Sequence, residues 1–90
     1  FILKQNYPNP FNPVTSIEID ILNADNITLT IYDINGREVK LLAQGNYQPG
    51  NYKFSWDSLD DLGQKVSSGI YIYQLKTSDN ISTKKMLLLK

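Results

Sequence analysis

Apolar and polar residues alternate with a period of two through most of the chain. Ile17 and Ile19 alternate with Ser16 and Glu18, and later runs repeat the pattern with other apolar residues. Such a run is typical of a strand with one buried face. β-Branched and aromatic residues, which suit a pleated surface, dominate the runs. The predicted strands are 16–21, 27–32, 37–42, 52–56, 70–77 and 81–89.

Turn signals separate these runs. Asn35-Gly36 is a dipeptide of tight turns, and Pro49-Gly50 precedes the run that contains the single tryptophan. The best helix candidate, 58–63, is too short for more than one turn. Short strands at this spacing predict an all-β fold, an antiparallel β-sandwich of six or seven strands.

Aromatic side chains fall on both faces of the predicted strands. We expect Trp56, Tyr71 and Tyr73 in the core, because a small sandwich needs large rings to fill its volume. Tyr32 and Tyr47 are freer to be exposed. A flat row of exposed rings would instead indicate a carbohydrate-stacking face, and this alternative stays open.

Prolines and asparagines crowd the segment that precedes the first long strand, "NYPNPFNPVTSIEI" at 6–19. Proline fixes its own φ and disfavours helix in the residue before it, so the segment is expected to be a stiff, extended arm. We expect Phe11 to be buried as a lid over the open end of the sandwich, whereas Tyr7 could face the core or the solvent. The domain prediction is one domain, 1–90, with the arm at 1–13 and the sandwich at 14–90.

Composition and charge exclude several classes of function. The formal net charge is zero, so no nucleic-acid partner is expected. The chain has no histidine and no cysteine, which removes the commonest general base and the thiol nucleophile, and we expect no catalysis. No apolar run approaches the roughly 20 residues that span a bilayer. Because it begins at Phe1 rather than Met, the chain is expected to be a piece of a longer protein.

Three aspartates lie close together in "WDSLDDLGQ": Asp57, Asp60 and Asp61. Closely spaced carboxylates in a loop can hold calcium. The final bidentate glutamate and the flanking helices of the twelve-residue calcium loop are missing, however. A turn whose aspartates accept hydrogen bonds from their own backbone amides is the favoured interpretation. No cofactor is expected, and metal binding at 57–61 is left open.

The tail "STKKMLLLK" is unusually hydrophobic for a last strand. As a strand it would place Met86 and Leu88 on one face and Leu87 and Leu89 on the other. One face of an outer strand in a two-layer sandwich should meet solvent, so plain packing and recognition by a partner are both possible. One form of recognition is addition of this strand to the edge of a partner sheet.

The order of these segments resembles the type A C-terminal sorting domain of type IX secretion. The resemblance covers nearly all 90 residues through "NYPNPFNPVTSIEI", "LTIYDINGREVKLL", "GNYKFSWDSLDDLGQKVSSGIYIYQL" and "KKMLLLK". The middle section is also similar to the Ig-like domain of flagellar hook-capping proteins. One departure is Ser58, which stands where many members of the sorting-domain family have glycine after Trp56-Asp57.

The resemblance assigns residues to four motifs. The first falls on Asn6, Tyr7, Pro8, Asn9, Pro10, Phe11 and Asn12. The second falls on Tyr32, Asp33, Gly36 and Val39. The late motif falls on Gly69, Tyr71 and Leu75, and the terminal motif on Lys85, Met86, Leu87, Leu88 and Lys90.

The resemblance also implies a function and partners. It implies a seven-stranded Ig-like antiparallel β-sandwich without catalysis, at the C-terminus of a secreted cargo protein of a Gram-negative bacterium. Such a domain directs its cargo from the periplasm through the outer-membrane translocon of type IX secretion. A sortase-like surface protease then removes the domain, and the cargo is attached to the cell surface. The alternative is an Ig-like adhesion or carbohydrate-binding module of a surface enzyme.

Overall fold

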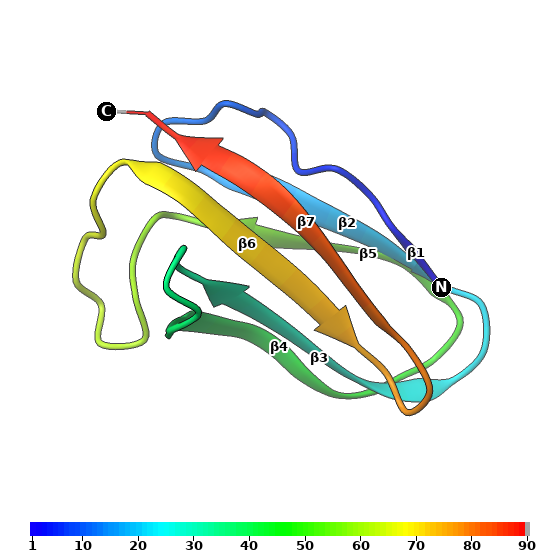
Figure 1. The fold of residues 1–90 in the computed structure, drawn as a ribbon. Coiled ribbons are helices and arrows are strands. Elements are labelled where there is room, and N and C mark those ends of the chain that lie inside the picture. The colour runs from blue at the N-terminus through cyan, green and yellow to red at the C-terminus, as the bar shows by residue number, and fades with distance from the viewer. Residues whose placement is uncertain (90) are drawn as a thin grey trace.

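The computed structural model describes residues 1–89, which form two antiparallel sheets packed face to face (Figure 1). The strand order is β1-β2-β5 in the three-stranded sheet and β4-β3-β6-β7 in the four-stranded sheet. The predicted antiparallel sandwich of about seven strands is confirmed. The strands are β1 (Ile2–Leu3), β2 (Thr15–Ile21), β3 (Asp25–Tyr32), β4 (Glu38–Tyr47), β5 (Gly50–Trp56), β6 (Gly69–Lys76) and β7 (Ile81–Leu88).

The core lies between the two sheets and is built from the alternating positions. Ile17 and Ile19 of β2 are fully buried, and Tyr73 and Leu75 of β6 face them from the other sheet. The predicted inward face of β6 and the predicted core positions of the tryptophan and of Tyr71 are confirmed. Residues 1–89 contain no helix that is long and apolar enough to cross a membrane.

Two strands differ most from the sequence prediction, whereas the bounds of the others agree to within two residues. β4 extends to Tyr47, five residues beyond the predicted end. Its pairing with β3 shifts register between Leu29 and Thr30 and again between Ile31 and Tyr32. Each shift adds a residue and interrupts the alternation, so a period-two pattern does not continue across it. β1 was not predicted, because two residues are too few to show a period.

The expectation that two tyrosines are free to be exposed to solvent is only partly met. Tyr32 and Tyr47 are both half-buried rather than exposed. The Tyr47 ring packs edge-on against Tyr52, with ring centroids 5.0 Å apart, and lies 6.0 Å from Phe54. These three rings fill the side of the sandwich where β4 passes into β5, so they extend the core there.

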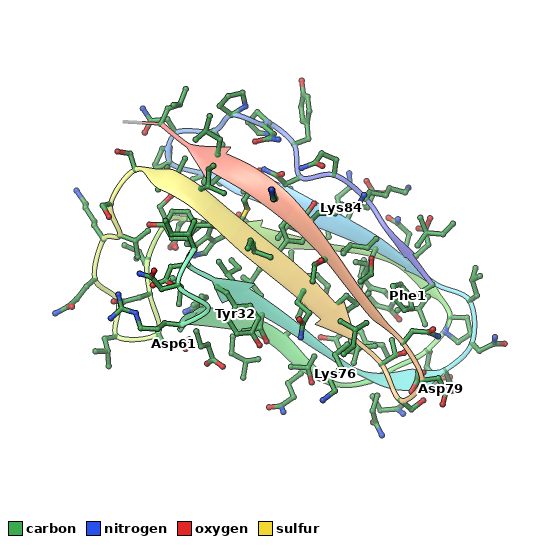
Figure 2. All side chains as sticks on the ribbon, in the orientation of Figure 1. Phe1, Tyr32, Asp61, Lys76, Asp79 and Lys84 are labelled. Atoms are coloured by element: carbon green, nitrogen blue, oxygen red, sulfur yellow. The ribbon has the colours of Figure 1, made fainter. Side chains whose placement is uncertain are left out.

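The 57–66 loop covers the outer edge of β4. The Asp61 backbone N–H donates to the Val39 carbonyl (3.0 Å), and the Asp61 carboxylate accepts from the Leu41 N–H (3.0 Å). One residue thus bonds to a carbonyl and an N–H on the outer edge of β4, as a paired strand would. Asp61 lies at the same end of the sandwich as Tyr32, opposite the end that carries Phe1 and Asp79 (Figure 2).

Ser58 sits in a backbone conformation that favours glycine. Its φ is +66°, the one positive φ at a non-glycine position among the described residues. The residue is buried, and its hydroxyl donates a hydrogen bond to the carbonyl of Pro13. The shape of the turn that glycine normally provides is therefore retained with serine, and the hydroxyl ties the loop to the arm.

Replacement of Ser58 separates these two effects. Ser58→Ala keeps the unfavourable φ and loses the hydrogen bond, and should lower the free energy of unfolding by about 1–2 kcal/mol. Ser58→Gly also loses the bond but relieves the φ, so its loss should be smaller. Urea unfolding of both variants measures this difference. A Gly variant less stable than the Ala variant would contradict the backbone argument.

Candidate functional site

The N-terminal arm crosses from one sheet to the other (Figure 1). After β1, the Lys4 N–H donates to the Glu18 carbonyl (3.0 Å), and Tyr7 exchanges two backbone hydrogen bonds with Ser16, each 2.9 Å. The arm then leaves β2 and reaches the far edge of the four-stranded sheet. Its path closes the side of the sandwich between β2 and β7.

At the far edge the arm pairs with the end of β7. The Phe11 N–H donates to the Leu87 carbonyl (3.0 Å), and the Leu89 N–H donates to the Phe11 carbonyl (2.9 Å). The Asn9 side-chain oxygen accepts from the Leu87 N–H (3.0 Å), and the Gln5 side chain donates to the Lys85 carbonyl (2.8 Å). The first and terminal motifs are thus joined into one surface.

Asn6 is the polar centre of this junction. It is 2% exposed, and its amide donates to the Thr15 hydroxyl (2.9 Å) and to the Pro8 carbonyl (3.1 Å). Its side-chain oxygen accepts from Gln5 (2.7 Å), and its backbone N–H donates to the Tyr73 hydroxyl (2.9 Å). A buried polar group is stabilising only when its hydrogen bonds are made, and here they are.

The Tyr73 hydroxyl ties the arm to the core of the four-stranded sheet. Besides accepting from Asn6, it donates to the Lys4 carbonyl (2.8 Å). Burial raises the pKa of Tyr73 to about 12, and the hydrogen bond from Asn6 opposes the rise without cancelling it. The phenol is therefore held neutral by the fold over a wider pH range than in water.

Phe11 is the predicted lid, and that prediction is confirmed. It is 2% exposed, and its ring lies 5.8 Å from Trp56, which in turn lies 5.3 Å from Tyr71 in an edge-on arrangement. The Trp56 indole N–H donates to the carbonyl of Leu59 (2.8 Å). Offset and edge-on ring pairs add to the stability that burial gives. The lid is therefore fixed by the backbone pairing with β7 and by its ring contacts.

The other residues of the first motif face solvent. Tyr7 is 81% exposed, which settles the orientation that the sequence left open. Pro8, Asn9, Pro10 and Asn12 are exposed as well. The motif thus divides into two buried residues that hold the fold and five exposed residues that a partner could contact.

The terminal motif divides in the same way. Met86 and Leu88 are buried in the core, whereas Lys85 is exposed and Leu87 half-buried on the outer face of the sheet. The prediction that this tail is apolar on both faces of its strand is therefore confirmed. Lys90 lies outside the described residues.

The edge of β7 is open only in part. From the Lys85 carbonyl to the Leu89 N–H, the backbone groups that point outward bond to the arm. Outward-pointing groups alternate along an antiparallel edge strand, so those of Ile81 and Thr83 belong to the same edge and lie beyond the arm. Strand addition at this edge is therefore limited to 81–83 while the arm is in place.

The second motif spans the turn from β3 to β4, at the end of the sandwich away from Phe1, and the late motif lies on β6. The Asp33 carboxylate accepts from the N–H groups of Asn35 (2.9 Å) and Arg37 (3.0 Å), and the bond from Arg37 is the main reason that the pKa of Asp33 falls below its ordinary value. Gly36 follows with φ +80°, as a tight turn requires. The Tyr71 hydroxyl donates to the carbonyl of Ser67.

These turns border an open groove between the 33–39 and 65–71 segments. Asp60 also lines it, and Arg37, another lining residue, is paired with Asp33 (3.2 Å). Residues of the second and late motifs line the groove, and no residue of the first or terminal motif does.

The aspartate cluster is a set of hydrogen-bond acceptors. Asp57 accepts from the N–H two residues on (3.2 Å), and Asp60 accepts from the N–H groups two and four residues on (both 2.9 Å). The favoured turn interpretation is confirmed for these two. It is wrong for Asp61, whose carboxylate bonds across to β4. Residues 1–89 hold no group of three or more carboxylate, histidine or cysteine side chains placed to share a metal ion.

Several residues of the junction were not among those predicted from the sequence. Thr15 occupies the same face of β2 as the buried isoleucines. A polar residue at a core position could therefore have indicated from the sequence that a buried hydrogen bond forms there. Gln5 gave no such signal, because its role depends on β7 arriving beside it. The role of the Tyr73 hydroxyl was likewise hidden, since the sequence indicated only that its ring is buried.

The buried and exposed halves of the first motif should respond differently to substitution. Asn6→Ala removes the hydrogen bonds of a buried side chain with Thr15, Pro8 and Gln5, and should lower the free energy of unfolding by about 1–3 kcal/mol. Asn12→Ala, at an exposed position of the same motif, should change it by less than about 0.5 kcal/mol. Denaturant unfolding of the two variants provides the comparison, and equal losses would contradict the division.

The raised pKa of Tyr73 predicts a loss of stability in alkali. Because the folded-state pKa lies above the ordinary value of 10, its contribution is complete below pH 10 and falls as the pH rises towards 12. The loss should total about 2–3 kcal/mol. It can be measured by urea unfolding at a series of pH values. A Tyr73→Phe variant should be less stable at neutral pH and should lose less between pH 10 and 12.

Comparison with solved structures shows the same fold in parts of three larger proteins. Dimeric latent PorU from Porphyromonas gingivalis superposes with a TM-score of 0.77 at 21% identity, over 97% of this chain and 9% of PorU. PorZ, an essential surface component of the type-IX secretion system of the same bacterium, gives 0.65 at 22% identity, over 96% of this chain and 11% of PorZ. FlgD from P. aeruginosa gives 0.63 at 23% identity, over 82% of this chain and 57% of FlgD.

The sequence itself identifies the family. No curated protein matches the chain. The FlgD Ig-like domain family matches residues 13–80, which include β2 to β6 and most of the sandwich. The match begins within the arm, at the proline whose carbonyl bonds to Ser58. The chain is therefore an all-β, Ig-like sandwich and belongs to the FlgD Ig-like domain family.

Proposed function

We propose that this chain is a non-catalytic C-terminal signal domain that directs a secreted cargo protein across the outer membrane by type IX secretion. Its partners would be the translocon, a sortase-like surface protease and the cargo domain upstream in the parent chain. The cargo would pass through the periplasm and be secreted or attached at the cell surface after removal of the domain.

One observation carries this proposal. The first and terminal motifs, at opposite ends of the sequence, are joined by backbone and side-chain hydrogen bonds between the arm and β7. A signal that is read after folding needs a surface that exists only in the folded chain. The junction is such a surface, and its arm presents the exposed ring of Tyr7 beside Ser16 of β2.

The likeness in fold to PorU and PorZ supports the proposal. It extends over nearly the whole of this chain and only about a tenth of each of those proteins. A module of this size is thus a minor part of larger proteins, as a signal domain would be. PorZ is itself a component of the type-IX system, so the fold occurs in that setting.

Export of a reporter tests the proposal. A signal-peptide-bearing reporter fused upstream of Phe1 should reach the surface or medium of a host with type IX secretion and remain in the periplasm of a translocon-deficient strain. Tyr7→Ser in the fusion should leave most of the reporter in the periplasm, because it removes the most exposed ring of the junction.

The matched control is Leu62→Ser. Leu62 is as exposed as Tyr7, 84% against 81%, but lies in the loop after the aspartate cluster and outside the motifs. Export of the Leu62→Ser fusion should be normal. Deletion of 85–90 is a poor test, because it also removes Met86 and Leu88 from the core. Normal export of the Tyr7→Ser fusion, or equal loss with Leu62→Ser, would contradict a role for the junction.

The carbohydrate-binding alternative makes a different prediction. It depends on a row of exposed rings, and among residues 1–89 Tyr7 is the one aromatic side chain that is mostly exposed. A glycan array probed with the isolated chain separates the two. Sugar binding together with failure of the reporter to leave the periplasm would favour the alternative.

A further inference from the structure

The outer face of the four-stranded sheet is divided into an apolar half and a polar half. The apolar half lies at the end where β7 finishes and β6 begins. Its side chains come from all four strands and the residue after β7, and three of them are exposed by 36–49%. They are Tyr32, Leu41, Ile70, Ile72, Leu87 and Leu89.

The remaining half of this face is mostly polar. It carries Thr28, Gln44, Gln74 and Lys76, with Ile81 as an isolated apolar side chain at its margin. The apolar half is therefore a patch with a boundary, and contiguous patches of this kind mark surfaces of association. Phe1 lies at the other end of the sandwich, so a domain attached there would join the molecule away from the patch (Figure 2).

One row of residues crosses this half of the sheet with opposite charges at its two ends. Lys85 on β7 pairs with Ile72 on β6, Ile72 with Tyr32 on β3, and Tyr32 with Glu38 on β4. Ile72 and Tyr32 point to the outer face, because Tyr71, Tyr73 and Ile31 beside them point inward. Lys85 and Glu38 share that face, because each lies directly opposite one of these two residues on the neighbouring strand. Among residues 1–89, neither charged end of the row has an ion-pair partner.

From this row we propose that two copies of the chain associate face to face through the apolar half. A twofold axis parallel to the strands places β7 of one copy over β4 of the other. Each Lys85 then lies over the Glu38 of the other copy, with Ile72 and Tyr32 stacked between them. Such a contact is isologous: the same patch of both copies forms it, and the two patches complement each other.

The charges also exclude the competing arrangement. A twofold axis perpendicular to the strands would place Lys85 over Lys85 and Glu38 over Glu38, and like charges in contact oppose association. Stacked sheets prefer strand directions within about 30° of each other, which an axis along the strands allows. The row therefore selects one orientation of the two copies.

The size of the patch predicts a weak dimer. The molecule measures 37 × 23 × 19 Å, so half of its broad face covers roughly 400 Å² per copy, about half of the area in a standard interface. We expect a dissociation constant on the order of 100 μM. The dimer does not depend on the export role, so either can fail without the other.

Sedimentation equilibrium of the chain over a range of concentrations tests the proposal. The unaltered chain should form dimers. Lys85→Glu and Glu38→Lys should each weaken self-association about tenfold, because symmetry changes both charge contacts at once. An equimolar mixture of these two variants should regain association, since every charge in the mixed dimer again meets its opposite. Lys76→Glu, on the polar half of the same face, is the matched control and should leave association unchanged.

Several results would overturn the proposal. A chain that stays monomeric at millimolar concentration has no such interface. If neither Lys85→Glu nor Glu38→Lys weakens the dimer, the dimer must form through another surface. The same conclusion follows if Lys76→Glu weakens the dimer as much as these two variants do. Failure of the mixture to associate would exclude the face-to-face orientation. Unfolding curves of each variant show whether a change in association comes from loss of the fold.

Discussion

The hydrogen bonds between the arm and β7 are the constraint on which the rest of this structure depends. A two-sheet sandwich has an open side wherever neighbouring strands belong to different sheets, and apolar side chains there would meet water. Here the open side between β2 and β7 is spanned by the arm, which bonds to both strands. Phe11 can seal the core only because its backbone is held against Leu87 and Leu89.

The same bonds explain why residues of one motif have different roles. Asn6 and Phe11 are buried and make the contacts that hold the arm, whereas Tyr7 is exposed between them in sequence. A mutation at a motif position can therefore remove function by unfolding the domain or by removing a contact with a partner. Stability must be measured beside any functional readout before a role in recognition is assigned.

Much of the fold could be predicted from the sequence because its strands are one-sided. The parity of Ile17, Ile19 and Tyr73 fixed which face is inward, and burial of apolar surface enforces that parity. The end of β4 could not be predicted, since register shifts interrupt the pattern. The polar network around Asn6 could not be predicted either, because its partners come together only when the arm, β2 and β6 are in place.

The contact between Asn9 and Leu87 also has a kinetic consequence. It joins positions 78 residues apart, almost the full length of the chain. Closing so long a loop costs more entropy than local pairing, and folds dominated by distant contacts form slowly. The arm can make its bonds to β7 only when the two ends of the chain have come together. The arm and the end of β7 then form their common surface only in a chain that has completed folding, so this surface distinguishes a finished molecule from an unfinished one.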